Sequence, residues 1–249
     1  MDTIYRALCS GFFINQKLTT KMDLPLKRET VLDLFERVRK DRPRLERFKR
    51  YQGELALESP IRAGEQEWVA LRRNSVRSGV VDPPSVADGL RLHRLALELA
   101  PFYLSINPLD IAGLELTYGF DLDASGNHNA IVRDALLRDT PLAKSIDSDA
   151  WAPLDIQPYI GIALNERCDL QAWIEVKTKT SVREVRQDRY RDEPISVCLT
   201  VRKVGSLKEI KELPLVFDTL TANAERLVND RVVPHLIQPL RQAIASANR

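Results

Sequence analysis

The amino-acid sequence predicts an α+β protein built from two degenerate β-α-β-β-(β)-α repeats, with a largely antiparallel sheet and helices on one face. Three observations lead to this prediction: short motifs that recur at a nearly constant offset, strands whose apolar and polar residues alternate, and helices placed between those strands. Alternation is typical of antiparallel sheets with one covered and one solvated face. The halves 1–108 and 109–249, related by a pseudo-twofold axis, would then pack as a single globular unit.

The recurring motifs keep the same order in both halves and lie 105 to 108 positions apart. The matched segments are Gly11-Phe12 and Gly119-Phe120, Gly53 and Gly161, Trp68 and Trp173, and Ser75-Val76-Arg77 and Ser181-Val182-Arg183. Loops absorb small insertions while strands and helices keep their order, so a near-constant offset indicates a duplication. The alternative is one α+β domain in which these matches are coincidental.

In the first half, hydrophobic periodicity predicts three strands and two helices. Thr30 with Asp33, and Ser85 with Asp88, have the spacing of a capping box, and apolar residues at helical spacing follow each pair. The expected strands are 11–18, 51–58 and one from Gln66 to the prolines at 83–84, and the expected helices start near Thr30 and Ser85 and run to about 42 and 100.

The second half repeats this order with an additional strand. The expected strands are 114–118, 156–164, 170–180 and 195–204, and the expected helices are 128–138 and 215–247. Within 170–180, apolar residues at even positions alternate with polar residues and Trp173 at odd positions. Pro234 and Pro239 should kink or divide the final helix, because each removes a backbone donor and crowds the preceding turn.

Composition narrows the class of protein. A hydrophobic fraction of 44%, a charged fraction of 29% and a net charge of +2 are ordinary for a soluble globular chain and argue against a dedicated nucleic-acid protein. Cys9, Cys168 and Cys198 form no CxxC pair, which favours free thiols in a reducing compartment. The sequence has no signal peptide and no apolar segment of about 20 residues. We therefore expect a cytoplasmic protein without membrane association.

No motif with a known catalytic spacing is present. The sequence lacks a GxxxxGK[ST] phosphate loop, a GxGxxG turn, an HExxH pair and a GxSxG elbow. His93, His128 and His235 are far apart, and we expect them at helix surfaces or boundaries rather than as ligands. The sequence thus favours a protein without catalytic activity and predicts no cofactor.

One acidic segment offers an alternative. Asp121, Asp123, Ser125 and Gly126 match the opening of a calcium loop, in which alternating oxygens converge on a hard cation. The twelfth position, where a glutamate should close the shell, is Val132. The sequence favours instead a β-to-α turn in which Ser125 or the following Asn caps the helix. Weak binding of Ca²⁺ or Mg²⁺, and a metal-assisted enzyme that uses Asp121 and Asp123, stay open as alternatives.

A second alternative comes from a basic run, residues 37–50, at the end of the first helix and in the segment after it. Its cations are Arg37, Arg39, Lys40, Arg42, Arg44, Arg47, Lys49 and Arg50. Such a cluster can neutralise several phosphates, which predicts binding of RNA or another polyanion. Cations also gather at helix ends because the helix dipole favours them there. The run can therefore also be explained by a solvated helix end and loop that bind no polyanion.

The predicted sheet leaves one face free of helices. Alternation assigns to it Glu54, Glu58, Trp68, Arg72, Glu115, Thr117, Tyr159, Gln171, Trp173, Glu175, Lys177, Thr200 and Arg202. The mixed charge disfavours a surface for DNA, whereas exposed tryptophans are typical of protein interfaces. The tryptophans could instead be covered by a loop or by long side chains. The sequence therefore favours a binding or scaffold protein with an unidentified protein partner, contacted through Trp68, Arg72, Tyr159, Trp173 and Glu175.

Overall fold

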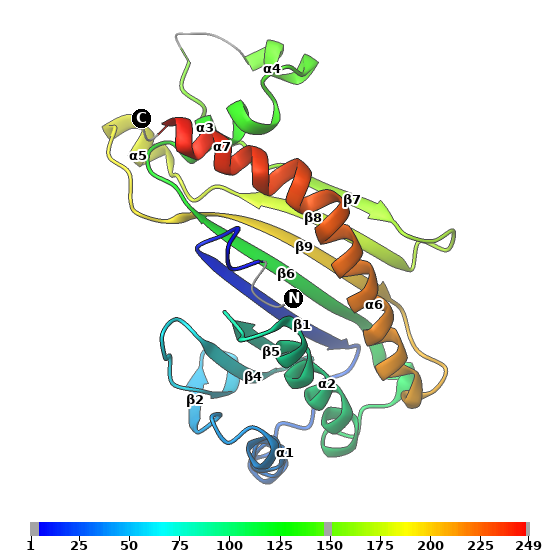
Figure 1. Cartoon of the computed structure of the whole chain (residues 1–249). Helices are drawn as coiled ribbons and strands as arrows, with labels where there is room; N and C mark the ends of the chain where they lie inside the picture. The colour runs from blue at the N-terminus through cyan, green and yellow to red at the C-terminus, as the bar shows by residue number, and fades with distance from the viewer. Residues whose placement is uncertain (1–4, 147–150, 248–249) are drawn as a thin grey trace.

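The computed structural model describes residues 5–146 and 151–247, and across them nine strands form one open antiparallel sheet. The strand order is β2-β3-β4-β5-β1-β6-β9-β8-β7, with β1 and β6 at the centre (Figure 1). The α+β class and the antiparallel sheet are thereby confirmed. The strands are β1 Gly11–Thr20, β2 Arg47–Tyr51, β3 Glu54–Glu58, β4 Gln66–Arg72, β5 Ser75–Val81, β6 Ile111–Asp123, β7 Tyr159–Ala163, β8 Leu170–Lys177 and β9 Pro194–Val204.

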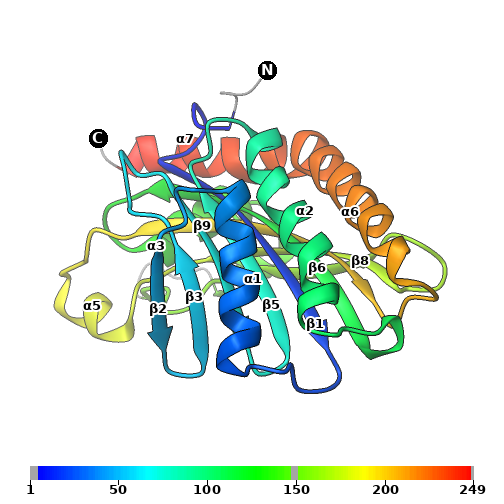
Figure 2. The same cartoon turned by 90° about the horizontal axis from the view of Figure 1, so that it is seen from below.

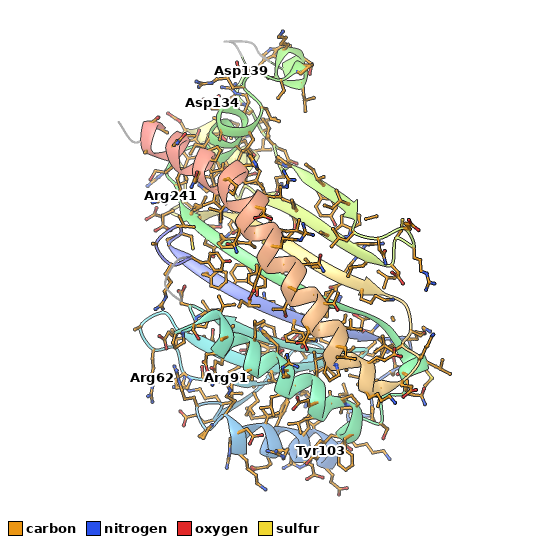
Figure 3. The ribbon with its side chains drawn as sticks, turned by 45° about the vertical axis from the view of Figure 1, so that its right-hand side comes forward. Arg62, Arg91, Tyr103, Asp134, Asp139 and Arg241 are labelled. Atoms are coloured by element: carbon orange, nitrogen blue, oxygen red, sulfur yellow. The ribbon has the colours of Figure 1, made fainter. Side chains whose placement is uncertain are left out.

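The long helices gather on one side of the sheet. Figure 2 shows α2, α6 and α7 together along that side, and α1 packs beside α2 while α3 packs against α7. In Figure 3, Tyr103 marks the end of α2 and Arg241 marks α7, with Asp134 of α3 at the opposite end of the molecule from α1. The helices are α1 Arg28–Asp41, α2 Val86–Tyr103, α3 His128–Leu136, α4 Pro141–Ile146, α5 Val182–Gln187, α6 Leu213–Leu227 and α7 Gln238–Ala247.

The hydrophobic core lies between these helices and the sheet. Along β1 every second residue is buried, beginning with Phe12 and Ile14, and β6 continues this layer with Tyr118 and Phe120. Phe217 of α6 is among the largest buried side chains on the helix side. Because strand side chains alternate between faces, this burial fixes which residues of each strand point away from the helices.

Several predicted elements need correction. The predicted strand from Gln66 onward is a hairpin, β4 and β5, which the two-residue turn at Arg73 and Asn74 connects. The basic run was expected to be a helix end and loop, but part of it forms the edge strand β2. Helix α1 begins at Arg28 and has no side-chain cap, so the capping box expected at Thr30 is absent, whereas Ser85 caps α2 as predicted.

The C-terminal helix is continuous but irregular. Between α6 and α7, residues Val228–Ile237 have π-helical hydrogen bonding, and Pro234 lies inside this segment. A proline cannot donate to the helical ladder, and wider π turns are a known way to accommodate such a break. The expected disturbance is therefore present as a π segment. Within the described residues, no helix is both long and apolar enough to span a membrane.

Candidate functional site

The sheet has a second face, on the side opposite to α1, α2, α6 and α7, which we call the open face. Trp68, Arg72, Trp173 and Glu175 belong to it because they alternate with core residues along β4 and β8. Tyr159 belongs to it because it is paired with Glu175 in the β7–β8 ladder. The other residues that the sequence assigns to this face lie there too: Glu54, Glu58, Glu115, Thr117, Gln171, Lys177, Thr200 and Arg202. Their position is confirmed, and their role in binding stays a prediction.

The two tryptophans lie on one row across the open face. Strand by strand, the register of this row is Trp68, Gly79, Asn15, Thr117, Thr200 and Trp173. With strands about 4.8 Å apart, five steps separate the tryptophans by roughly 24 Å. The middle of the row is polar, and the hydroxyls of Thr117 and Thr200 are 2.8 Å apart in a hydrogen bond.

Three aromatic rings lie flat on this face because each sits against a glycine of the neighbouring strand. The pairs are Trp68 with Gly79, Phe13 with Gly119, and Trp173 with Gly161. A Cβ atom added to any of these glycines would lie 2.5 Å or less from the opposing ring. Both tryptophans are half-buried as a result. The open face therefore offers broad, low aromatic surfaces rather than protruding rings.

Long side chains also contact the tryptophan rings. The Arg77 guanidinium lies 5.4 Å from the centre of the Trp68 ring, and that of Arg202 lies 4.6 Å from the Trp173 ring. Tyr159 stacks on Trp173 with ring centres 5.1 Å apart. The expectation that long side chains cover the tryptophans is thus correct in part, because each ring keeps some exposed surface. A stacked aromatic pair beside a cation is a common recognition element at protein interfaces.

Most charges on the open face are paired. Glu54 accepts hydrogen bonds from Arg72 at 2.5 Å and from Arg77 at 2.9 Å. Lys177 contacts Glu175 at 3.0 Å. The thiol of Cys198 is buried on this face, and burial raises its pKa to about 11, so it stays protonated at neutral pH. The surface is therefore mixed in charge and has no activated thiol at this position.

The predicted basic cluster is divided by the fold. Arg42 is withdrawn into ion pairs with Glu67 at 3.2 Å and Asp88 at 3.3 Å, and its side chain is only 17% exposed. Three further cations have carboxylate partners: Arg37 with Asp41, Arg39 with Glu36, and Arg44 with Glu65. The remaining cations of the cluster, which have no ion-pair partner within the described part of the chain, are Lys40 on α1 and Arg47, Lys49 and Arg50 on β2.

The acidic segment is arranged differently from a calcium loop. Asp121 and Asp123 belong to strand β6, and both accept hydrogen bonds from serine hydroxyls: Asp121 from Ser196, and Asp123 from Ser10 at 2.7 Å. In the chain described by the structure, no three His, Cys, Asp or Glu side chains are grouped to hold a metal ion. Ser125 lies in the turn that follows, where Gly126 has φ of +84° and Asn127 caps α3.

A buried polar network lies under the centre of the sheet. The hydroxyl of Ser78 lies 2.9 Å from the side-chain amide of Gln16 and 2.8 Å from Nδ1 of His93, which is completely buried. The expectation that His93 lies at a helix surface is therefore wrong, because its side chain is buried. His128 does lie at a helix boundary, as the first residue of α3, but its side chain is buried as well. Sequence periodicity placed His93 within a leucine-rich helix but did not reveal that Ser78, fifteen residues earlier, provides its polar partner.

We expect His93 to make stability depend on pH. Burial holds its pKa at about 3, well below its ordinary value of 6.5. The unfolded chain takes up this proton as the pH falls below 6.5 while the folded chain does not, so stability falls by up to about 1.4 kcal/mol per pH unit. In urea unfolding between about pH 7 and pH 5, His93→Gln should flatten this dependence. Equal slopes for both proteins would contradict the assignment.

A separate cavity of about 780 Å³ opens between the start of α1 and the β2–β3 hairpin. Its walls combine apolar side chains, among them Leu24, Leu71 and Phe48, with Arg28 and Arg50. The volume is in the range of small-molecule pockets. This cavity could not be predicted from sequence patterns, because it depends on how the β2–β3 hairpin folds against α1.

The glycines under the rings belong to the candidate site, and sequence reasoning missed their position. Gly79 was not singled out, and Gly161 was noted only as a repeat marker. An isolated glycine inside a strand pattern does signal a close approach, but the partner is known only once the register is fixed. Compared with models of known protein families and with curated proteins, the chain matches none.

Proposed function

We propose that this chain is a non-catalytic binding protein that recognises a protein partner through the open face. The observation that carries the proposal is the pair of flat, half-buried tryptophans on one row of that face, roughly 24 Å apart. A surface that extends over this distance is comparable in size with a standard protein interface. Aromatic residues backed by arginine are also the side chains most often found at the energetic centres of such interfaces.

The charge pattern supports a protein rather than a nucleic acid as partner for this face. Arg72 and Arg77 share Glu54, and Lys177 is balanced by Glu175. A surface that follows a phosphate backbone needs unbalanced positive charge. Complementary pairs of both signs instead give selectivity between protein partners.

The proposal is tested by affinity capture from native extract, with bound protein and bound nucleic acid both measured. Wild type is compared with Trp68→Ala/Trp173→Ala and with a variant in which Arg47, Lys49 and Arg50 are replaced by Gln. A protein that wild type and the glutamine variant capture but the tryptophan variant does not would support binding through the open face. Capture that is identical in all three would overturn the proposal.

A second candidate function is polyanion binding through the cations of β2. The observation that favours it is that Arg47, Lys49 and Arg50 lie exposed on an edge strand without carboxylate partners in the described chain. In the same capture experiment, polyanion binding predicts that wild type captures nucleic acid and that the glutamine variant does not. The affinity of wild type for nucleic acid should fall steeply with salt, since each neutralised phosphate releases a counterion.

We also infer that residues 1–108 and 109–249 are degenerate copies related by a pseudo-twofold axis between β1 and β6. Two features support this. The strand order β3-β4-β5-β1 in one half corresponds to β7-β8-β9-β6 in the other. Trp68 and Trp173 lie at equal distances from the central pair. The other sequence matches do not support it: Ser75 begins strand β5, whereas Ser181 caps helix α5.

A circular permutant tests the two-copy inference. Residues 7–10 line a cavity together with Arg241, Ile244 and Ala245, so a short linker can join the ends of the described chain. We expect a permutant that begins at residue 109 and ends at residue 108 to unfold cooperatively, because it keeps both repeats whole. A permutant opened between Arg73 and Asn74 divides one repeat and should be less stable. Equal loss of stability in both permutants would contradict the inference.

A further inference from the structure

The two edges of the sheet differ in chemistry. Edge strand β2 has the sequence RFKRY, and its cations discourage pairing with another strand. Edge strand β7 has the sequence YIGIA, without any charge, and all five of its residues are exposed. Tyr159, Ile160 and Ile162 are 59%, 56% and 41% exposed. An uncharged apolar edge of this kind is a template for another strand.

The backbone of β7 is also free to pair. Pro158 accepts a hydrogen bond from the Val176 amide, and the Leu164 amide donates to Leu170, so even-numbered residues bond to β8. In an antiparallel ladder the alternate residues direct their N–H and C=O groups to the other side. Tyr159, Gly161 and Ala163 therefore offer three donors and three acceptors along the outer edge.

We propose that β7 pairs antiparallel with β7 of a second copy of this chain, about a twofold axis at Gly161. The strand is self-complementary around that glycine, since an isoleucine lies on each side of it. In this register Gly161 faces its own counterpart, and Tyr159 faces Ala163 of the second copy. The outward backbone groups of these three residues then satisfy one another, which an isolated edge leaves to water.

The side chains fit the same register. Ile160 is placed opposite Ile162 of the second copy, and Ile162 opposite its Ile160, so four exposed isoleucines come together on the helix side of the sheet. Directly opposed β-branched residues stabilise antiparallel pairs. Dimerisation would bury these isoleucines, which no helix of the described chain covers.

Charge favours β7 rather than β2 as the strand that pairs with a second copy. Two β7 strands placed antiparallel oppose no like charges, because YIGIA contains no charged residue. β2 placed against β2 would instead bring Lys49 level with its own counterpart.

The dimer would join two open faces into one surface on a sheet twice as wide. Tyr159, Gly161 and Trp173 lie at the β7 edge, so the stacked aromatic pairs of both copies come close to the twofold axis. The inference depends on the edge strand alone. It would hold even if the open face had no protein partner.

Analytical ultracentrifugation of the full chain tests the dimer. We expect a reversible monomer–dimer equilibrium between micromolar and sub-millimolar concentrations, as for a small interface. Ile160→Lys/Ile162→Lys places like charges opposite one another and should weaken dimerisation by about tenfold or more. The matched control is Leu215→Lys on α6, where the wild-type side chain is 66% exposed. A monomer at every concentration, or equal weakening by the control, would overturn the proposal.

Cysteine cross-linking tests the register independently of folding defects in the lysine variant. Exposed Cys168 is first replaced by serine. An equimolar mixture of Ile160→Cys and Ile162→Cys chains should form disulfides between unlike chains, because directly opposed residues bring their Cα atoms within disulfide range. Each variant alone should cross-link several-fold less. Preferential cross-linking of like chains, or none in the mixture, would contradict a twofold axis at Gly161.

Discussion

Replacing Trp68 and Trp173 together by alanine should abolish most partner binding while the chain stays folded. Truncation of a central interface aromatic typically weakens binding by about 2 kcal/mol or more, roughly 30-fold, for each anchor. The stability loss should be smaller than for a core tryptophan, about 1–2 kcal/mol each, because the rings are half-buried and lie on the sheet surface. Binding is measured by quantitative capture, and stability by urea unfolding.

Phe102→Ala provides the matched control for this experiment. Phe102 is an aromatic residue of α2 that is 81% exposed on the helix side, away from the open face. It should leave binding and stability nearly unchanged. If the double-tryptophan variant bound its partner as wild type does, the open face would not be the interface. If it unfolded, with a loss of about 3 kcal/mol or more per ring, the tryptophans would be core residues.

The second large effect is expected at Asn129, which is completely buried. Its side-chain nitrogen donates to the Leu154 carbonyl at 2.9 Å, and its oxygen accepts from the Ile156 amide at 2.9 Å and from the Thr178 hydroxyl at 2.6 Å. This one side chain therefore ties the extended segment that precedes β7 to the end of the sheet. The segment has no regular secondary structure that would otherwise hold it.

Asn129→Ala should lower the free energy of unfolding by about 3 kcal/mol, since three hydrogen bonds are lost and their buried partners are left unsatisfied. Hydrogen exchange should show faster exchange of the Ile156 amide than in wild type. Asn223→Ala, at a half-buried asparagine of α6, serves as control and should change stability by about 0.5 kcal/mol or less. An unchanged exchange rate at Ile156 would contradict the role assigned to Asn129.

Periodicity predicted the parts of the fold in which burial alternates. Apolar residues at every second position predicted a strand at 170–180, of which Leu170–Lys177 forms β8, and they placed Trp173 on the open face. The Ser85 cap is local and was also predictable. These features depend on residues that are close in sequence, so one sequence is enough to predict them.

The features that sequence reasoning missed depend on contacts between distant segments or on strands without a buried face. All residues of β2 are exposed, so it carries no alternation, and its cations suggested a loop. The turn between β4 and β5 contains no glycine, so a hairpin resembled one long strand. The alignment of Trp68 with Trp173 depends on the register of six strands, and the withdrawal of Arg42 depends on Glu67 and Asp88.

Site-specific photo-cross-linking tests most directly the claim that the open face is the binding surface. Benzoylphenylalanine is placed at Lys17 or Thr117, near the centre of the open face, and at Leu215 on the exposed side of α6. In native extract, we expect one protein adduct of the same mass from Lys17 and from Thr117, and none from Leu215. Adducts from Leu215 alone, or equal adducts from all three positions, would contradict binding through the open face.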